Sequence, residues 1–132
     1  MKLLKAALFT ALFSCAGLAN AELISNVPLD TSRFELMPIS ELSASAAQGN
    51  DHSQFYLAKQ KQKGEGVAQN TQQAIQWYTK AAQQGVAPAQ LNLAIMYLRG
   101  EGVQPNLQQA RLWLEKAAMR GDNRARYTLA LL

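Results

Sequence analysis

The chain has 132 residues, a length that suits one domain and not two. It contains 13 Lys and Arg against 9 Asp and Glu, and 11 basic residues remain once the first 21 residues, which we expect to be removed, are left out. The resulting charge of +2, without a long basic run, argues against a nucleic-acid partner, and the single histidine, His52, excludes a histidine-pair metal site.

The N-terminal residues have the pattern of a secretory signal. Lys2 and Lys5 precede an apolar run over residues 6–16, and Ala19-Asn20-Ala21 supplies the small residues that signal peptidase requires. The apolar run is too short to span a bilayer, which takes about 20 residues. We therefore expect residues 1–21 to be a signal peptide cleaved after Ala21, with a periplasmic or secreted product and no stable membrane insertion after cleavage.

A second interpretation of this segment is a lipoprotein signal. Leu12-Phe13-Ser14-Cys15 is similar to a bacterial lipobox, in which Cys15 is lipidated and becomes the first residue. Phe13 is bulky for that motif, so cleavage after Ala21 is the preferred interpretation. That cleavage removes the only cysteine, and the exported domain then depends on its apolar core without disulfides.

Two short segments precede the main part of the chain. Residues 22–37 lack a helical period and predict an extended leader. Residues 38–50 predict a degenerate half-repeat, because Ile39, Leu42 and Ala46 have the spacing of core positions in the full repeats that follow. The ordered fold is therefore expected to begin at residue 38.

A 36-residue repeat organises the rest of the chain. Residues 51–86 and 87–122, aligned without gaps, are identical at sixteen of 36 positions. The repeated structural positions are glycines, a tryptophan and an alanine: Gly64, Gly66, Trp77, Ala81 and Gly85 in the first unit, and Gly100, Gly102, Trp113, Ala117 and Gly121 in the second. Chance does not place these residue types in one register, so each unit is one structural repeat.

Each repeat has the pattern of two helices joined by a tight loop. In the second unit, Leu93, Ala94 and Tyr97 share one face of a first helix. Gly100 ends that helix as a left-handed cap, and Asn106 caps the second helix. We expect the tryptophans of both units to fill the core. The fold class is thus all-α, a short α-solenoid of stacked antiparallel helix pairs.

The same residues carry a family resemblance. In chain order, the second unit contains Ala89, Leu93-Ala94, Tyr97, Gly100-x-Gly102-Val103, Asn106, Ala110, Trp113, Ala117-Ala118 and Gly121. This motif resembles the Sel-one-like repeat, a relative of the tetratricopeptide repeat, and the resemblance covers residues 51–122. It implies a superhelix of helix-turn-helix pairs that assembles protein complexes.

The end of the chain predicts one more helix. Residues 123–132 form a terminal half-repeat that finishes on Leu129, Leu131 and Leu132. One interpretation is a capping helix whose leucines pack on the preceding helix. The alternative is an open end of the solenoid that self-associates or receives a partner.

The first helices of the pairs are expected to line the inner side of the solenoid, where such proteins bind partners. The candidate partner-binding residues on this side are Gln54, Lys61, Gln90, Asn92, Arg124 and Arg126. The basic run over residues 59–63 has two interpretations: lysine stems laid over the core with solvated charges, or a basic patch for an acidic partner.

Catalytic patterns are missing from the sequence. It contains no Ser-x-x-Lys, no Gly-x-Ser-x-Gly and no phosphate loop, since both Gly-x-Gly motifs follow helices and not strands. We expect no catalysis, no cofactor and no metal. The favoured function is an exported protein–protein interaction module, an adaptor or scaffold in the bacterial cell envelope. The alternative is an immunity protein that neutralises a toxic effector, and a cell-wall or β-lactam-related enzyme ranks third.

Overall fold

The structure is a computed structural model that describes residues 32–65 and 69–132. These residues form helices and loops, with no strand among them. The helices in chain order are α2 (Ser32–Leu36), α3 (Ile39–Ala47), α4 (Asp51–Lys63), α5 (Thr71–Gln83), α6 (Ala87–Arg99), α7 (Leu107–Met119) and α8 (Asn123–Leu131). The predicted signal peptide, Cys15 and Gly66 lie outside the described residues.

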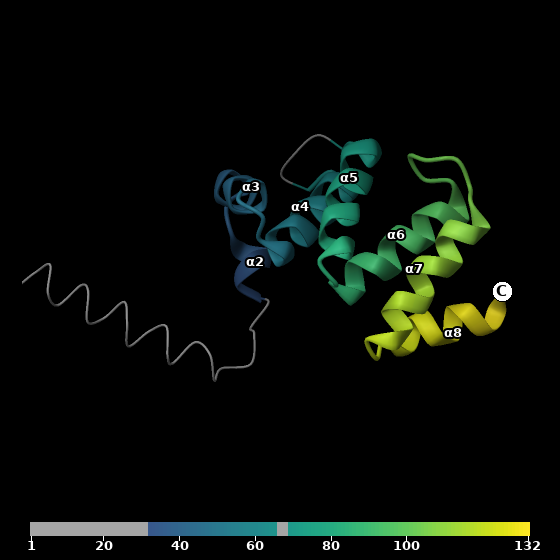
Figure 1. The fold of residues 1–132 in the computed structure, drawn as a ribbon. Helices are drawn as coiled ribbons and strands as arrows, with labels where there is room; N and C mark the ends of the chain where they lie inside the picture. The colour runs from purple at the N-terminus through teal and green to yellow at the C-terminus, as the bar shows by residue number, and fades with distance from the viewer. Residues whose placement is uncertain (1–31, 66–68) are drawn as a thin grey trace, which may run out of the picture. The chain divides into compact units, whose positions relative to one another are not determined.

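Each helix from α3 to α7 packs against the next one along the chain (Figure 1). Helices α4 and α5 form the pair of the first repeat, and α6 and α7 form that of the second. Helix α3 precedes the first pair and α8 follows the second. This confirms the all-α solenoid of stacked helix pairs.

Local capping explains where the helices begin and end. The Asn70 and Asn106 side-chain oxygens each accept a hydrogen bond at 3.0 Å from the backbone N–H three residues on, which satisfies one free donor of the first turn. Helices α4 and α6 end at Gly64 and Gly100, whose φ angles of 77° and 72° lie in the left-handed region. The repeated glycines and asparagines thus place the loop between the two helices at the same position in both units.

The core runs through the stack and depends on small residues. Ala58, Ala81, Ala94 and Ala117 are fully buried, so neighbouring helices approach closely. The largest fully buried side chain is Tyr78. One buried cluster includes these alanines and Tyr78. A second buried cluster joins α3 to α4.

The tryptophans differ from one another in burial. Trp113 is buried as expected, whereas Trp77 is only partly buried and packs against both clusters. The Lys80 and Lys116 ammonium groups lie 4.4 and 4.6 Å from the Trp77 and Trp113 ring centroids. Trp77 therefore packs on the core as expected but remains partly exposed, and each of the two rings also meets a lysine.

The predicted extended leader needs a correction at its end. Ser32–Leu36 form helix α2, although the sequence analysis placed residues 22–37 in an extended segment. The Phe34 ring stacks on His52 and Tyr56, with centroids 5.8 Å from each, and these contacts hold α2 against α4. Residues 22–31 of the same prediction lie outside the described part of the chain.

The C-terminal helix covers the stack with only one of its leucines. Leu129 packs against the core, while Leu131 is 69% exposed and Leu132 is 43% exposed. Tyr127 is also exposed. The expectation that all three leucines pack on α7 is therefore wrong for the last two.

Over residues 32–65 and 69–132, no helix combines the length and apolar character needed to cross a membrane.

Candidate protein-binding surfaces

Two of the predicted partner-binding residues are buried. Gln54 and Gln90 are 4% and 3% exposed, and their Nε2 atoms donate to the carbonyl oxygens of Ala46 and Ala82 at 3.2 and 3.0 Å. Each carbonyl belongs to the last turn of the preceding helix and also accepts a backbone N–H, from Gly49 at 3.1 Å and from Gly85 at 3.0 Å. Gln54 and Gln90 thus link consecutive helices through their Nε2 atoms, and neither lies on an exposed row of partner contacts.

The two glutamines differ at their side-chain oxygens. Gln84 donates to Gln54 Oε1 at 2.7 Å and to the Gly49 carbonyl at 3.1 Å. Arg120 stands in place of Gln84 in the second repeat. Gln90 Oε1 is buried there, with no hydrogen-bond partner among the described residues.

Asn92 lies at a hydrogen-bonded chain between the two repeats. Its Nδ2 donates to the Tyr78 hydroxyl at 3.3 Å, which donates to Gln62 Oε1 at 2.9 Å, and Gln62 Nε2 donates to Glu101 Oε2 at 3.2 Å. Burial raises the pKa of Tyr78 to about 12, against the opposing effect of the Asn92 hydrogen bond and with a further rise from the Glu101 charge. The hydroxyl therefore stays neutral and available for hydrogen bonding.

Around Asn92, α4 and α6 form a hollow of about 250 Å³ whose charges are balanced. Its lining includes three cations that each have a carboxylate within 4.0 Å. The pairs are Lys59 with Glu35 at 3.5 Å, Lys63 with Glu65 at 3.9 Å, and Arg99 with Glu101 at 3.4 Å. Such exposed pairs add little to stability, but they neutralise this face. Two of the three lysines in the run over residues 59–63 are thus paired with carboxylates.

Lys61 lies in a different hollow from Asn92. Its Nζ donates to Gln73 Oε1 at 2.7 Å, and it lines a space of about 380 Å³ together with Trp77 and Lys80. The structure therefore does not bring the predicted partner-binding residues into one row.

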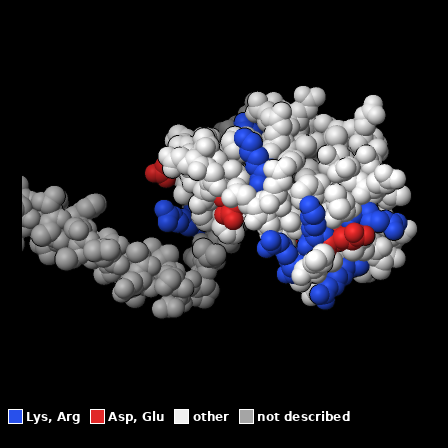
Figure 2. Space-filling model, in the orientation of Figure 1, with Lys and Arg blue, Asp and Glu red and all other residues white. Residues whose placement is uncertain are grey.

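Arg124 and Arg126 are both exposed on α8 and belong to a basic end of the helical stack. Residues 107–132 contain five basic and two acidic residues, whereas residues 32–65 contain four of each. We call the following set the basic end: Arg111, Lys116, Arg120, Arg124 and Arg126. Figure 2 shows lysine and arginine side chains gathered over this part of the molecule, with few acidic ones among them.

Most cations of the basic end have no carboxylate partner in the described part of the chain. Within the described part of the chain, only Arg124 of this set has a carboxylate within 4.0 Å, which is Asp122 at 3.3 Å. Burial acts to raise the pKa of Asp122, but hydrogen bonds from the Arg124 side chain and the Ala125 backbone N–H outweigh it and hold this pKa below its usual value. Asp122 is thus committed to capping α8, and the other cations remain available.

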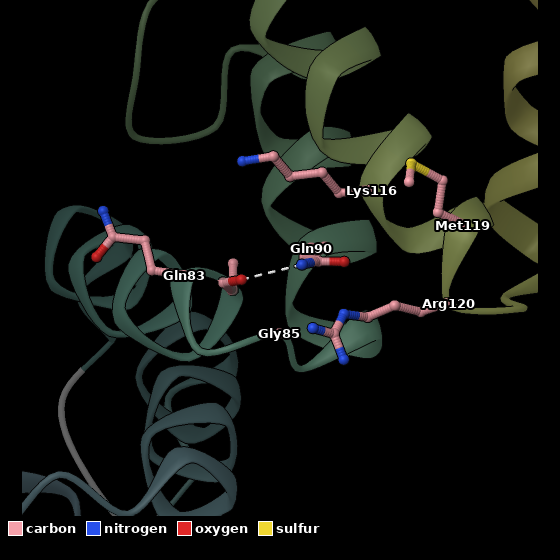
Figure 3. Close-up of a pocket in the computed structure, with 7 residues that line it drawn as sticks. Gln83, Gly85, Gln90, Lys116, Met119 and Arg120 are labelled. Atoms are coloured by element: carbon pink, nitrogen blue, oxygen red, sulfur yellow. Dashed lines mark hydrogen bonds between the residues drawn. The ribbon is translucent and has the colours of Figure 1, made fainter.

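Next to the basic end, α5, α6 and α7 enclose a hollow of about 420 Å³, which we call the α5–α7 pocket (Figure 3). Its polar lining comprises Gln83, Gln90, Lys116 and Arg120. Met119, which is 87% exposed, adds an apolar group. Of this lining, only Gln90 is among the partner-binding residues predicted from the sequence; the change from Gln84 to Arg120 between the aligned repeats is the signal that points to the others.

Residues that could hold a metal ion do not gather. Across residues 32–65 and 69–132, no group of three or more His, Cys, Asp or Glu side chains lies together. The structural features that invite a ligand are therefore hydrogen-bonding and cationic groups.

Comparison with known proteins identifies the family of the chain. No curated protein matches it. Among solved structures, it is similar to a Sel1 repeat protein from Oxalobacter formigenes, with 35% identity and a TM-score of 0.69 over 70% of this chain and 38% of that one. It is also similar to a protective antigen of uropathogenic Escherichia coli that displays an SLR fold, with 32% identity and a TM-score of 0.69 over 72% of this chain and 20% of that one.

A third similar structure is Helicobacter pylori cysteine rich protein B, with 26% identity and a TM-score of 0.66 over 69% of this chain and 68% of that one. The chain thus spans well under half the length of the first two proteins. The Sel1 repeat matches residues 51–86 and 87–122, the same two units that self-alignment delimits. The chain belongs to the Sel1 repeat family.

Proposed function

We propose that this protein is an exported interaction module that serves as an adaptor or scaffold in the bacterial cell envelope. Sel1 repeat proteins are protein-interaction modules and are typically non-catalytic scaffolds. The basic head, the short apolar run and Ala19-Asn20-Ala21 support export.

The observation that carries the binding proposal is the uneven distribution of charge. The basic end holds cations without carboxylate partners in the described structure, while Lys59 and Lys63 on α4 each have a carboxylate within 4.0 Å. Unmatched cations on a rigid helical surface attract an acidic partner and orient its approach. The partner is therefore expected to be a protein with an acidic surface.

Affinity capture from the periplasm of the bacterium that encodes the protein tests this function. A variant with Arg111→Gln and Arg126→Gln removes two unmatched cations, and the control with Lys59→Gln and Lys63→Gln removes two matched ones at equal change in net charge. We expect one acidic protein to be retained by the wild type and the control and to be lost from the first variant. Absence of any stoichiometric partner, or equal loss from both variants, would contradict the proposal.

The export part has its own test. We expect the protein recovered from the periplasm to begin at Glu22 on N-terminal sequencing. An intact Met1 in the cytoplasmic fraction, or a lipid-modified Cys15, would contradict cleavage after Ala21. If the captured partner is a toxin that the protein inactivates, the adaptor role is replaced by the immunity role.

A further inference from the structure

The α5–α7 pocket contains a buried acceptor that the protein leaves unused. Gln90 is 3% exposed, and its Oε1 has no hydrogen-bond partner in the described structure. The amide cannot be turned around, because Nε2 donates to the Ala82 carbonyl, which only a donor can satisfy. Figure 3 shows this bond, with the Gln90 oxygen directed away from it toward α7. A buried acceptor without a donor costs about 1–3 kcal/mol, so a ligand that supplies the donor is favoured.

The preceding repeat shows how the same position is satisfied internally. There Gln84 donates both to Gln54 Oε1 and to the Gly49 carbonyl. In the second repeat the guanidinium of Arg120 lies over Gly85, so close that a Cβ added at Gly85 would collide with it. No hydrogen bond joins Arg120 to Gln90 in the described structure. The replacement of glutamine by arginine therefore frees an acceptor and adds a charge.

Two cations line the pocket without a carboxylate. Lys116 places its ammonium over the Trp113 ring, and Arg120 lies over the Gly85 backbone. Neither has an acidic side chain within 4.0 Å among the described residues. The pocket thus presents two positive charges and one unfilled acceptor around a hollow of about 420 Å³.

We propose that the α5–α7 pocket binds an acidic side chain from an extended segment of the partner protein. The carboxylate contacts Lys116 and Arg120, and a backbone N–H of the same segment donates to Gln90 Oε1. A free inorganic anion without a proton supplies no donor for Gln90, whereas a peptide carries an N–H close to every acidic side chain. Met119 at the rim packs against the neighbouring residue of the segment. This proposal rests on the protein-binding function proposed above and names its site.

An NMR titration of the isotope-labelled full chain with a defined peptide tests the pocket. The probe is a hexapeptide of alternating glutamate and glycine, acetylated and amidated so that only its side chains are acidic. The matched probe contains glutamine in place of glutamate. We expect saturable shifts of the Gly85 backbone amide and the Gln90 side-chain amide with the acidic peptide only. No saturable shift, equal shifts with both peptides, or displacement by inorganic sulfate at equal ionic strength would overturn the proposal.

Arg120→Gln is the decisive variant, because it recreates the arrangement that Gln84 forms in the first repeat and should fold normally. Loss of one charged hydrogen-bond partner and filling of Gln90 Oε1 are expected to weaken peptide binding about tenfold or more. The control, Lys63→Gln, removes an equal charge far from the pocket lining and should change binding by about twofold or less. Equal effects of the two variants would show that general electrostatic attraction accounts for peptide binding, and would refute the proposed site.

The reverse exchange, Gln84→Arg, is expected to free Gln54 Oε1 and create a second site, which raises the stoichiometry of peptide binding. Periplasmic capture separates the two proposals. A partner retained by Arg120→Gln as strongly as by the wild type overturns the pocket and leaves the binding function standing. Peptide binding that depends on Arg120, without any captured protein, supports the pocket and contradicts the function.

Discussion

Replacing Tyr78 by phenylalanine should change how stability depends on pH. Burial raises the pKa of Tyr78 from 10.0 to about 12, and the side chain is fully buried. Between these two pH values the unfolded chain loses the hydroxyl proton while the folded chain retains it. The free energy of unfolding therefore falls by about 1.4 kcal/mol for each pH unit above 10, or about 2–3 kcal/mol in total. Phenylalanine has no such proton, so the variant lacks this contribution.

Urea unfolding of both proteins at pH 8, 10, 11 and 11.5, followed by circular dichroism, measures the difference. At pH 8 the wild type should be more stable by about 1 kcal/mol, because it keeps the hydroxyl bonds to Asn92 and Gln62. That advantage should disappear by pH 11 and reverse above it. Subtracting the variant cancels the titration of the other tyrosines and lysines. An advantage that stays constant from pH 8 to 11.5 would refute the burial of a neutral hydroxyl.

Three further substitutions test the core and the caps by thermal or urea unfolding. Gln54→Ala removes two side-chain hydrogen bonds, to the Ala46 carbonyl and from Gln84, and should cost about 1–3 kcal/mol, and a loss below about 0.5 would contradict a structural role. Trp113→Ala should cost about 3–5 kcal/mol, well above Leu112→Ala on the exposed side of α7, and equal losses would show that the ring is not in the core. Asn106→Ala should cost about 1 kcal/mol, whereas Asn106→Asp retains the cap, so similar losses for the two would exclude capping.

The local features of the fold could be read from the sequence because the interactions that produce them are close along the chain. A first helix that ends at a Gly100 cap is predicted for the second unit, and α6 ends at Arg99 with Gly100 as its cap. Alignment of the two repeats identifies only the residues that recur, such as the tryptophans. Tyr78, the largest fully buried side chain, has Leu114 at the equivalent position and was missed for that reason.

The binding surface was harder to predict, because it depends on which carbonyl or carboxylate meets each polar side chain. From the sequence, Gln54 and Gln90 are predicted to be exposed. Only the fold shows that each side chain reaches a carbonyl eight residues earlier. One signal was present: both units keep glutamine at this position, as they keep their core leucines. The basic end was hidden because a small net charge says nothing about how charges are distributed or paired.

Site-specific photo-crosslinking is the most direct test of the claim that the α5–α7 pocket and the basic end bind a partner protein. A photoreactive phenylalanine analogue is placed at Met119, beside the pocket, and in a second protein at Leu36 on α2. These side chains are matched in exposure, at 87% and 85%. After irradiation in the periplasm, we predict one defined crosslinked protein from position 119 that is lost with Arg120→Gln, and none from position 36. The same product from both positions, or from position 119 regardless of Arg120, would contradict the account.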